Sequence, residues 1–121
     1  MVDFLVTDLS VSEKQIRVLL NEEASRSGII QAFIDLRKDT RIKEGYPILI
    51  FYAGHGAEVI SPERWETGDT KIQAIVPHDY PVVPYLPDRT IGALIDLISG
   101  EKGDNIVCHS NHYLNIELMC F

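Results

Sequence analysis

A histidine and a cysteine that lie 53 residues apart can act together on a carbonyl carbon. His55 stands in the stretch Tyr52-Ala53-Gly54-His55-Gly56, directly after the apolar run 48–51, and Cys108 follows the apolar pair Ile106-Val107. A thiol becomes a strong nucleophile when a base removes its proton, and the same imidazole then protonates the leaving amine. These residue types predict a Cys/His dyad with His55 as base and Cys108 as nucleophile.

The glycines beside the histidine add to this interpretation. Residues without a Cβ at positions 54 and 56 let the backbone approach a substrate closely. The backbone N–H groups of Gly56 and Cys108 are the candidates for an oxyanion hole. Each residue also has a purely structural interpretation: His55 as a histidine in a glycine turn at a strand end, and Cys108 as a buried, inert thiol.

A metal site is the alternative for the C-terminal cysteines. Cys108, His109, His112 and Cys120 offer the ligand types that zinc takes in tetrahedral sites. Their spacing, C-H-x2-H-x7-C, matches none of the usual zinc patterns. Zinc is therefore disfavoured, and we predict no cofactor.

The pattern of apolar residues and breakers predicts alternating strands and helices. The apolar stretch 48–53 is typical of a strand buried on both faces, as in a parallel sheet. Residues 57–70 are predicted to form a polar loop. The proline-rich stretch 81–87 cannot form a central strand. The other expected elements are strands at 16–20, 71–76 and from 105, and helices at 28–38, capped by Ser25, and near 90–100, capped by Thr90 or Asp88.

This alternation predicts an α/β sandwich with a mostly parallel sheet. Right-handed crossovers bring the C-terminal ends of such strands to one edge, where sites form in open α/β sheets. His55 and Cys108 both follow predicted strands, so we expect both at that edge.

Length and charge narrow the function classes. The 121 residues fit one domain, and the net charge of −7 with no basic patch argues against a nucleic-acid partner. The acidic second half favours a basic substrate, or is simply a solvated surface. Without a membrane-length apolar run or a basic leader at the start, we expect no membrane association, a cytoplasmic location and free cysteines.

Several stretches together resemble one enzyme family. They are Glu22–Arg26, Pro47–Ala57 with Phe-Tyr-Ala-Gly-His-Gly, Lys71–Tyr80, Pro87–Ile91, Lys102–Ile106 and the triplet Cys108-His109-Ser110. In these stretches the chain resembles the caspase-like cysteine peptidases of the metacaspase type, peptidase family C14. The resemblance makes residues 1–110 a partial large-subunit domain and leaves 111–121 as a tail unrelated to the family pattern.

The resemblance implies a fold and an activity. The fold would be a three-layer caspase-like sandwich, and the activity would be that of a thiol protease, a hydrolase that cleaves proteins or peptides after Arg or Lys. His55 would be the general base, Cys108 the nucleophile and Gly56 an oxyanion donor. Many members respond to calcium, but we assign no calcium ligands here.

The chain also departs from the family pattern. We expect a truncated domain whose sheet is incomplete at its N- and C-terminal ends. Each strand residue adds about 3.3 Å of length. If Ile48 and Asn105, the first residues of two predicted strands, lie side by side, then Cys108 lies about 13 Å short of His55 along the strand direction. This predicts that the dyad is not assembled. The alternative function is a non-catalytic caspase-like interaction module, with an open sheet edge that favours self-association.

Overall fold

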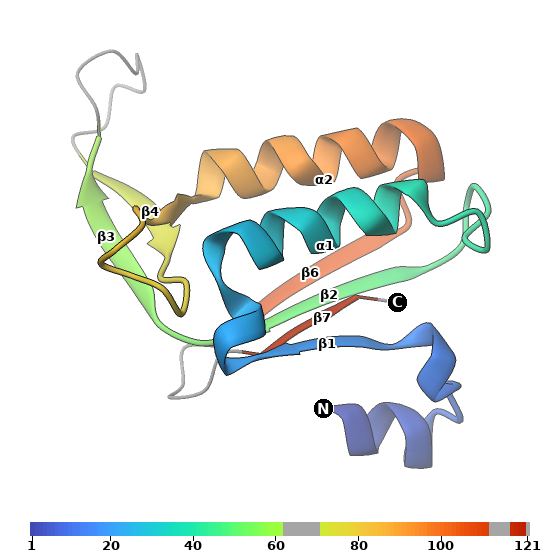
Figure 1. Ribbon diagram of the computed structural model, residues 1–121. Helices are drawn as coiled ribbons and strands as arrows, with labels where there is room; N and C mark the ends of the chain where they lie inside the picture. The colour runs from blue at the N-terminus through green and yellow to red at the C-terminus, as the bar shows by residue number, and fades with distance from the viewer. Residues whose placement is uncertain (62–70, 112–116, 121) are drawn as a thin grey trace.

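Two β-sheets and two long helices dominate the computed structural model, which describes residues 1–61, 71–111 and 117–120 (Figure 1). The mixed α/β class predicted from the sequence is confirmed. In chain order the elements are η1 Phe4–Asp8, η2 Glu13–Gln15, β1 Arg17–Leu20, η3 Asn21–Ala24, α1 Arg26–Lys38, β2 Ile48–Ala53, β3 Gly56–Ile60, β4 Lys71–Ile75, β5 Leu86–Pro87, α2 Asp88–Lys102, β6 Ile106–Asn111 and β7 Glu117–Cys120.

The larger sheet has the strand order β1-β7-β2-β6. Strands β2 and β6 run parallel from the pair Ile48 and Ile106 to the pair Ala53 and Asn111. Strand β7 runs antiparallel to both β1 and β2, and β3, β4 and β5 form a separate antiparallel sheet. The prediction of a mostly parallel sheet is therefore wrong for the described residues, because β3 and β4 pair with each other and β7 pairs antiparallel with both of its neighbours.

Residues 117–120 form a strand that the sequence did not predict. This strand, β7, lies in the interior of the larger sheet, between β1 and β2 (Figure 1). Strand β6 also continues three residues beyond Cys108, because β2 offers a partner at each position as far as Ala53. Residues 117–120 are thus part of the sheet, and whether segment 111–121 is related to the family pattern stays a prediction.

Residues 56–60 also correct a prediction, since they form β3 and not a loop. Their side chains alternate: Ala57 and Val59 are half-buried, while Glu58 and Ile60 are exposed. This two-residue period is that of a strand with one face against the protein. The rest of the predicted loop, 62–70, lies outside the described residues.

Local chemistry explains where the helices begin. The Ser25 hydroxyl accepts a hydrogen bond from the Gly28 N–H at 3.1 Å, which confirms the predicted cap of α1. A Cβ at Gly28 would lie 2.2 Å from the Glu23 carbonyl oxygen, so only glycine fits this close approach. Helix α2 follows Pro87 without a side-chain cap at that position, in place of the Thr90 or Asp88 cap predicted.

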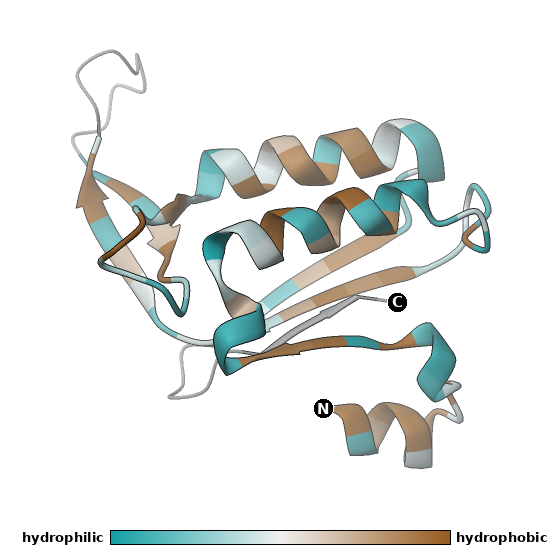
Figure 2. Cartoon of the chain, viewed as in Figure 1, coloured by the Kyte–Doolittle hydropathy of each residue, from teal (hydrophilic) through white to brown (hydrophobic). Residues whose placement is uncertain are grey.

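Both long helices cover the same face of the larger sheet (Figures 1 and 2). The predicted apolar stripe of α1, Ile29, Phe33 and Leu36, is buried in one core with Ile50 of β2 and Ile98 of α2. On the opposite face, Leu5 of the short η1 packs against Phe51. The third layer expected from the resemblance is reduced, in the described part, to this N-terminal segment. No helix there is long and apolar enough to span a membrane.

A buried lysine joins α2 to the loop before β2. Lys102 is 8% exposed, and its ammonium donates to the carbonyl oxygens of Asp39 at 2.8 Å and Ile42 at 2.9 Å. In return the Lys102 carbonyl accepts from the Gly45 N–H at 2.8 Å. The loop that leads into β2 is therefore held on the end of α2.

We predict that Lys102→Met destabilises the fold by about 1.5–3 kcal/mol, because two partly buried carbonyls lose charge-assisted donors while the aliphatic stem remains. Urea unfolding followed by circular dichroism measures the change. The matched control is Lys71→Met, whose lysine is exposed and makes a long ion pair of 3.5 Å with Glu58. The control should change stability by less than about 0.5 kcal/mol, and equal losses in both variants would contradict this role.

Candidate functional site

The backbone of His55 is fixed by two hydrogen bonds just beyond β2. Its carbonyl oxygen accepts from the Tyr52 hydroxyl and from the Val76 N–H, both at 2.9 Å. His55 itself is an exposed residue. The structure thus places His55 at the C-terminal end of the central strand, as the sequence predicted, with a held backbone and an accessible ring.

Tyr52 is the buried residue that organises this turn. Its hydroxyl also contacts the Val76 carbonyl oxygen at 3.3 Å, and the residue is only 4% exposed. Burial raises the pKa of Tyr52 to about 12. The phenol therefore keeps its proton at neutral pH and can donate to His55. This role of Tyr52 was not predictable from the sequence, because an apolar strand offers no sign that one of its rings carries a structural hydroxyl.

An open cavity of about 300 Å³ lies beside His55. It is lined by Gly54, His55, Gly56, Ala57, Glu58 and Gln73. Glu58 pairs with Lys71 at 3.5 Å across β3 and β4, and both side chains are at least half-exposed. Glu58 was not predicted as a site residue, because position 58 falls in the loop predicted for 57–70. The short alternation from Ala57 to Ile60 was the available signal.

Cys108 does not lie at the end of its strand. It pairs with Ile50 in the middle of β2, whereas the last residue of β2, Ala53, pairs with Asn111. Cys108 is thus three residues, or about 10 Å, before the level at which β2 ends, and His55 comes two residues later still. The predicted position of Cys108 at the functional edge is corrected, and the structure does not bring the two dyad residues together.

The surroundings of Cys108 do not activate its thiol. Paired residues of adjacent strands point to the same face, so Cys108 shares the helix side of the sheet with Ile50. Although Cys108 is an exposed residue, partial desolvation raises the pKa of its thiol, which reduces the thiolate fraction at neutral pH. The next residue, His109, stacks on Phe51 at a centroid distance of 5.8 Å, on the opposite face.

The predicted oxyanion pair is also separated. Gly56 opens β3 in the smaller sheet and pairs with Ile75, while Cys108 lies within the larger sheet. For the metal alternative, the described residues contain no group of three His, Cys, Asp or Glu side chains able to hold an ion. His112 and the side chain of Cys120 lie outside what the structure describes.

Comparison of the chain with protein-family models, with curated proteins and with solved structures finds no match in any of the three. The site must therefore be interpreted from its own geometry and from the sequence resemblance.

We predict that Tyr52→Phe lowers the free energy of unfolding by about 1 kcal/mol at pH 8, because the ring stays buried while the bond to the His55 carbonyl is lost. The folded-state pKa of Tyr52 lies above its ordinary value of 10.0. Its contribution is therefore fully present below pH 10 and is lost as the pH rises through about 12.

Parallel urea titrations of the wild type and Tyr52→Phe at pH 8, 10 and 12 isolate this group from other titrating residues. The stability difference should shrink as the pH rises. A difference that stays constant over this range would show that the Tyr52 hydroxyl is not held as described.

Proposed function

We propose that this chain carries a cysteine endopeptidase domain of the caspase/metacaspase class, which cleaves peptide bonds after Arg or Lys with His55 as base and Cys108 as nucleophile. The main support is topological. Parallel strands β2 and β6 are direct neighbours, His55 follows the first strand, and Cys108 lies on the second. Adjacent parallel strands are an arrangement in which residues distant in sequence can share one sheet edge.

The charge around His55 supports a basic substrate side chain. Glu58 lines the cavity beside the imidazole, and its exposed pair with Lys71 is weak enough to be replaced. Residues 51–121 carry ten acids and four bases, so the field on this half of the chain attracts cations. A lysine or arginine side chain next to the scissile bond fits this environment.

Catalysis requires an arrangement that differs from the one described. A nucleophilic thiol has to lie within about 3 Å of the imidazole. The present register leaves Cys108 three positions before the end of β2. A shift of β6 along β2 by three residues would turn every side chain of β6 to the other face of the sheet. The hydrogen bonds between the two strands would therefore have to break and form again in a different register.

The same register favours a second candidate, a non-catalytic caspase-like module that acts through protein contacts. Strand β6 is the last strand of the described sheet, so one of its edges has no strand partner there. Val107 on this strand is 59% exposed. An exposed edge with an apolar side chain favours strand-to-strand association.

A covalent peptide probe with arginine next to its reactive group distinguishes the two candidates. Under the peptidase proposal the probe labels Cys108 at least tenfold more than Cys120, as measured by intact mass and peptide mapping. Substitution His55→Ala should abolish this preference, because the thiol then has no base.

A folded control is essential for this experiment. Circular dichroism and urea unfolding of His55→Ala establish that the variant keeps the wild-type fold. Labelling of Cys108 that is equal in the wild type and His55→Ala would refute the peptidase proposal. The second candidate predicts that outcome, with a labelling rate that rises only above the ordinary thiol pKa of about 8.5.

The interaction-module candidate makes its own prediction at the β6 edge. Substitution Val107→Lys should lower any concentration-dependent self-association at least fivefold, because an edge lysine opposes strand pairing. Sedimentation velocity over a range of protein concentrations measures it. Ile60→Lys is the matched control, since Ile60 is 84% exposed on the smaller sheet. Equal effects of both substitutions would contradict association through β6.

A further inference from the structure

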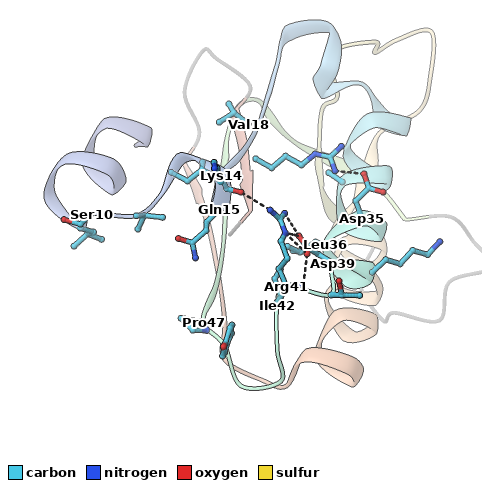
Figure 3. A pocket seen from close by; sticks show the side chains of 18 residues that line it. Ser10, Lys14, Gln15, Val18, Asp35, Leu36, Asp39, Arg41, Ile42 and Pro47 are labelled. Carbon is cyan, nitrogen blue, oxygen red and sulfur yellow. Dashed lines mark hydrogen bonds and ion pairs between the residues drawn. The ribbon is translucent and has the colours of Figure 1, made fainter.

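A second cavity lies at the end of β2 that is opposite to His55. It measures about 1070 Å³ and opens between the segment that leads into β1 and the loop that joins α1 to β2 (Figure 3). Pro47, directly before β2, is part of its lining, whereas His55 follows the other end of that strand. We call this cavity the basic cleft.

The basic cleft collects positive charge in an acidic chain. Four of the eleven Lys and Arg residues line it, against two of the eighteen Asp and Glu residues. The cleft lining therefore carries a formal charge of +2 in a chain of net charge −7. The four bases are Lys14, Arg17, Lys38 and Arg41, and the two acids are Asp35 and Asp39.

Both acids are already neutralised by arginines. Arg17 Nη1 lies 2.5 Å from Asp35 Oδ2, and Arg41 Nη2 lies 2.6 Å from Asp39 Oδ2. Hydrogen bonds from Arg41 lower the pKa of Asp39 to about 2. In Figure 3 dashed lines mark these contacts at Asp35 and between Arg41 and Asp39, among the residues that line the cleft. In the described part of the chain Lys14 and Lys38 form no ion pair, although the charge of Lys38 contributes to lowering the pKa of Asp35. The lining as a whole therefore keeps its surplus of two positive charges.

The arginines also hold the two walls at a defined separation. The Arg17–Asp35 pair joins β1 to α1, and Arg41 Nη1 donates across the cleft to the Lys14 carbonyl oxygen at 3.4 Å. A guanidinium has five N–H donors, and among the described residues the Arg17 guanidinium donates to Asp35 alone. Arg17 can therefore donate to a further anion without leaving its carboxylate.

The remaining lining is largely apolar. Val11, Ile16 and Val18 come from the N-terminal wall, and Leu36 and Ile42 from the other side. A cavity of this volume accepts a compact organic molecule, and apolar walls with a few polar groups are typical of such sites. The complementary ligand has an apolar body to fill the cleft and a doubly negative group to match the +2 formal charge of its lining.

From this charge and shape we infer that the basic cleft binds a small amphipathic dianion, either a phosphate monoester or a dicarboxylate on an apolar ring. This binding site is separate from the proposed peptidase site, because the two lie at opposite ends of β2. An experiment that refutes one of these two proposals does not affect the other.

The test is a fluorescence titration of the full chain with 1-naphthyl phosphate at low ionic strength. We expect saturable binding that weakens at least tenfold in the double variant Lys14→Gln, Lys38→Gln, since both residues are exposed and the fold should persist. Lys71→Gln removes one exposed lysine outside the cleft and should change the affinity less than twofold.

Three further ligands separate charge from shape and one anion from the other. Neutral 1-naphthol and inorganic phosphate should each bind at least tenfold more weakly than 1-naphthyl phosphate, because each lacks one of the two features. Naphthalene-2,3-dicarboxylate, compared with the phosphate ester, decides which dianion is preferred. Absence of saturable binding of both dianions, or equal affinity in the double variant and Lys71→Gln, would overturn the inference.

Discussion

The parallel pairing of β2 with β6 is the constraint on which the rest of the structure depends. Strand β2 has partners on both sides, supplies the sheet residues at the centre of the core and leads directly to His55. The start of β6 is tied to the start of β2, since the Ile48 N–H donates to the Asn105 carbonyl and the Asn105 amide donates to the Gly45 carbonyl at 3.1 Å. Because Ile48 pairs with Ile106, Cys108, two residues further along β6, must pair with Ile50.

The turn between α2 and β6 explains why those starts cannot easily shift. Gly103 adopts a positive φ of 85° that favours glycine, and a Cβ there would come within 3.3 Å of the Gly45 backbone nitrogen. Lys102 holds the facing loop through two carbonyls. A peptidase arrangement therefore has to break contacts at this turn or rebuild the pairing of β6, and either change has an energetic cost.

Much of the described fold was predictable where the signal is local. The continuous apolar run of β2, the Ser25 cap and the stripe Ile29, Phe33 and Leu36 each depend on neighbours a few residues away. Strand β7 was not predictable, because its place between β1 and β2 depends on partners some 70 to 100 residues distant. The site falls between these cases. The sequence indicated that Cys108 stops short of His55, but level starts at Asn105 placed it opposite Phe51, whereas the structure pairs it with Ile50.

The basic cleft shows a further limit of linear pattern analysis. Residues 1–50 carry eight acids and seven bases, which in sequence is a nearly neutral mixture with no visible patch. Folding sorts these charges, because the segment before β1, the end of α1 and the loop before β2 bring four bases to one cleft, while two arginines neutralise its acids. At the other end of β2, Glu58 stands beside an accessible imidazole. The central strand thus runs from a cleft whose lining has a surplus of positive charge to a cavity whose lining contains one acid and no lysine or arginine.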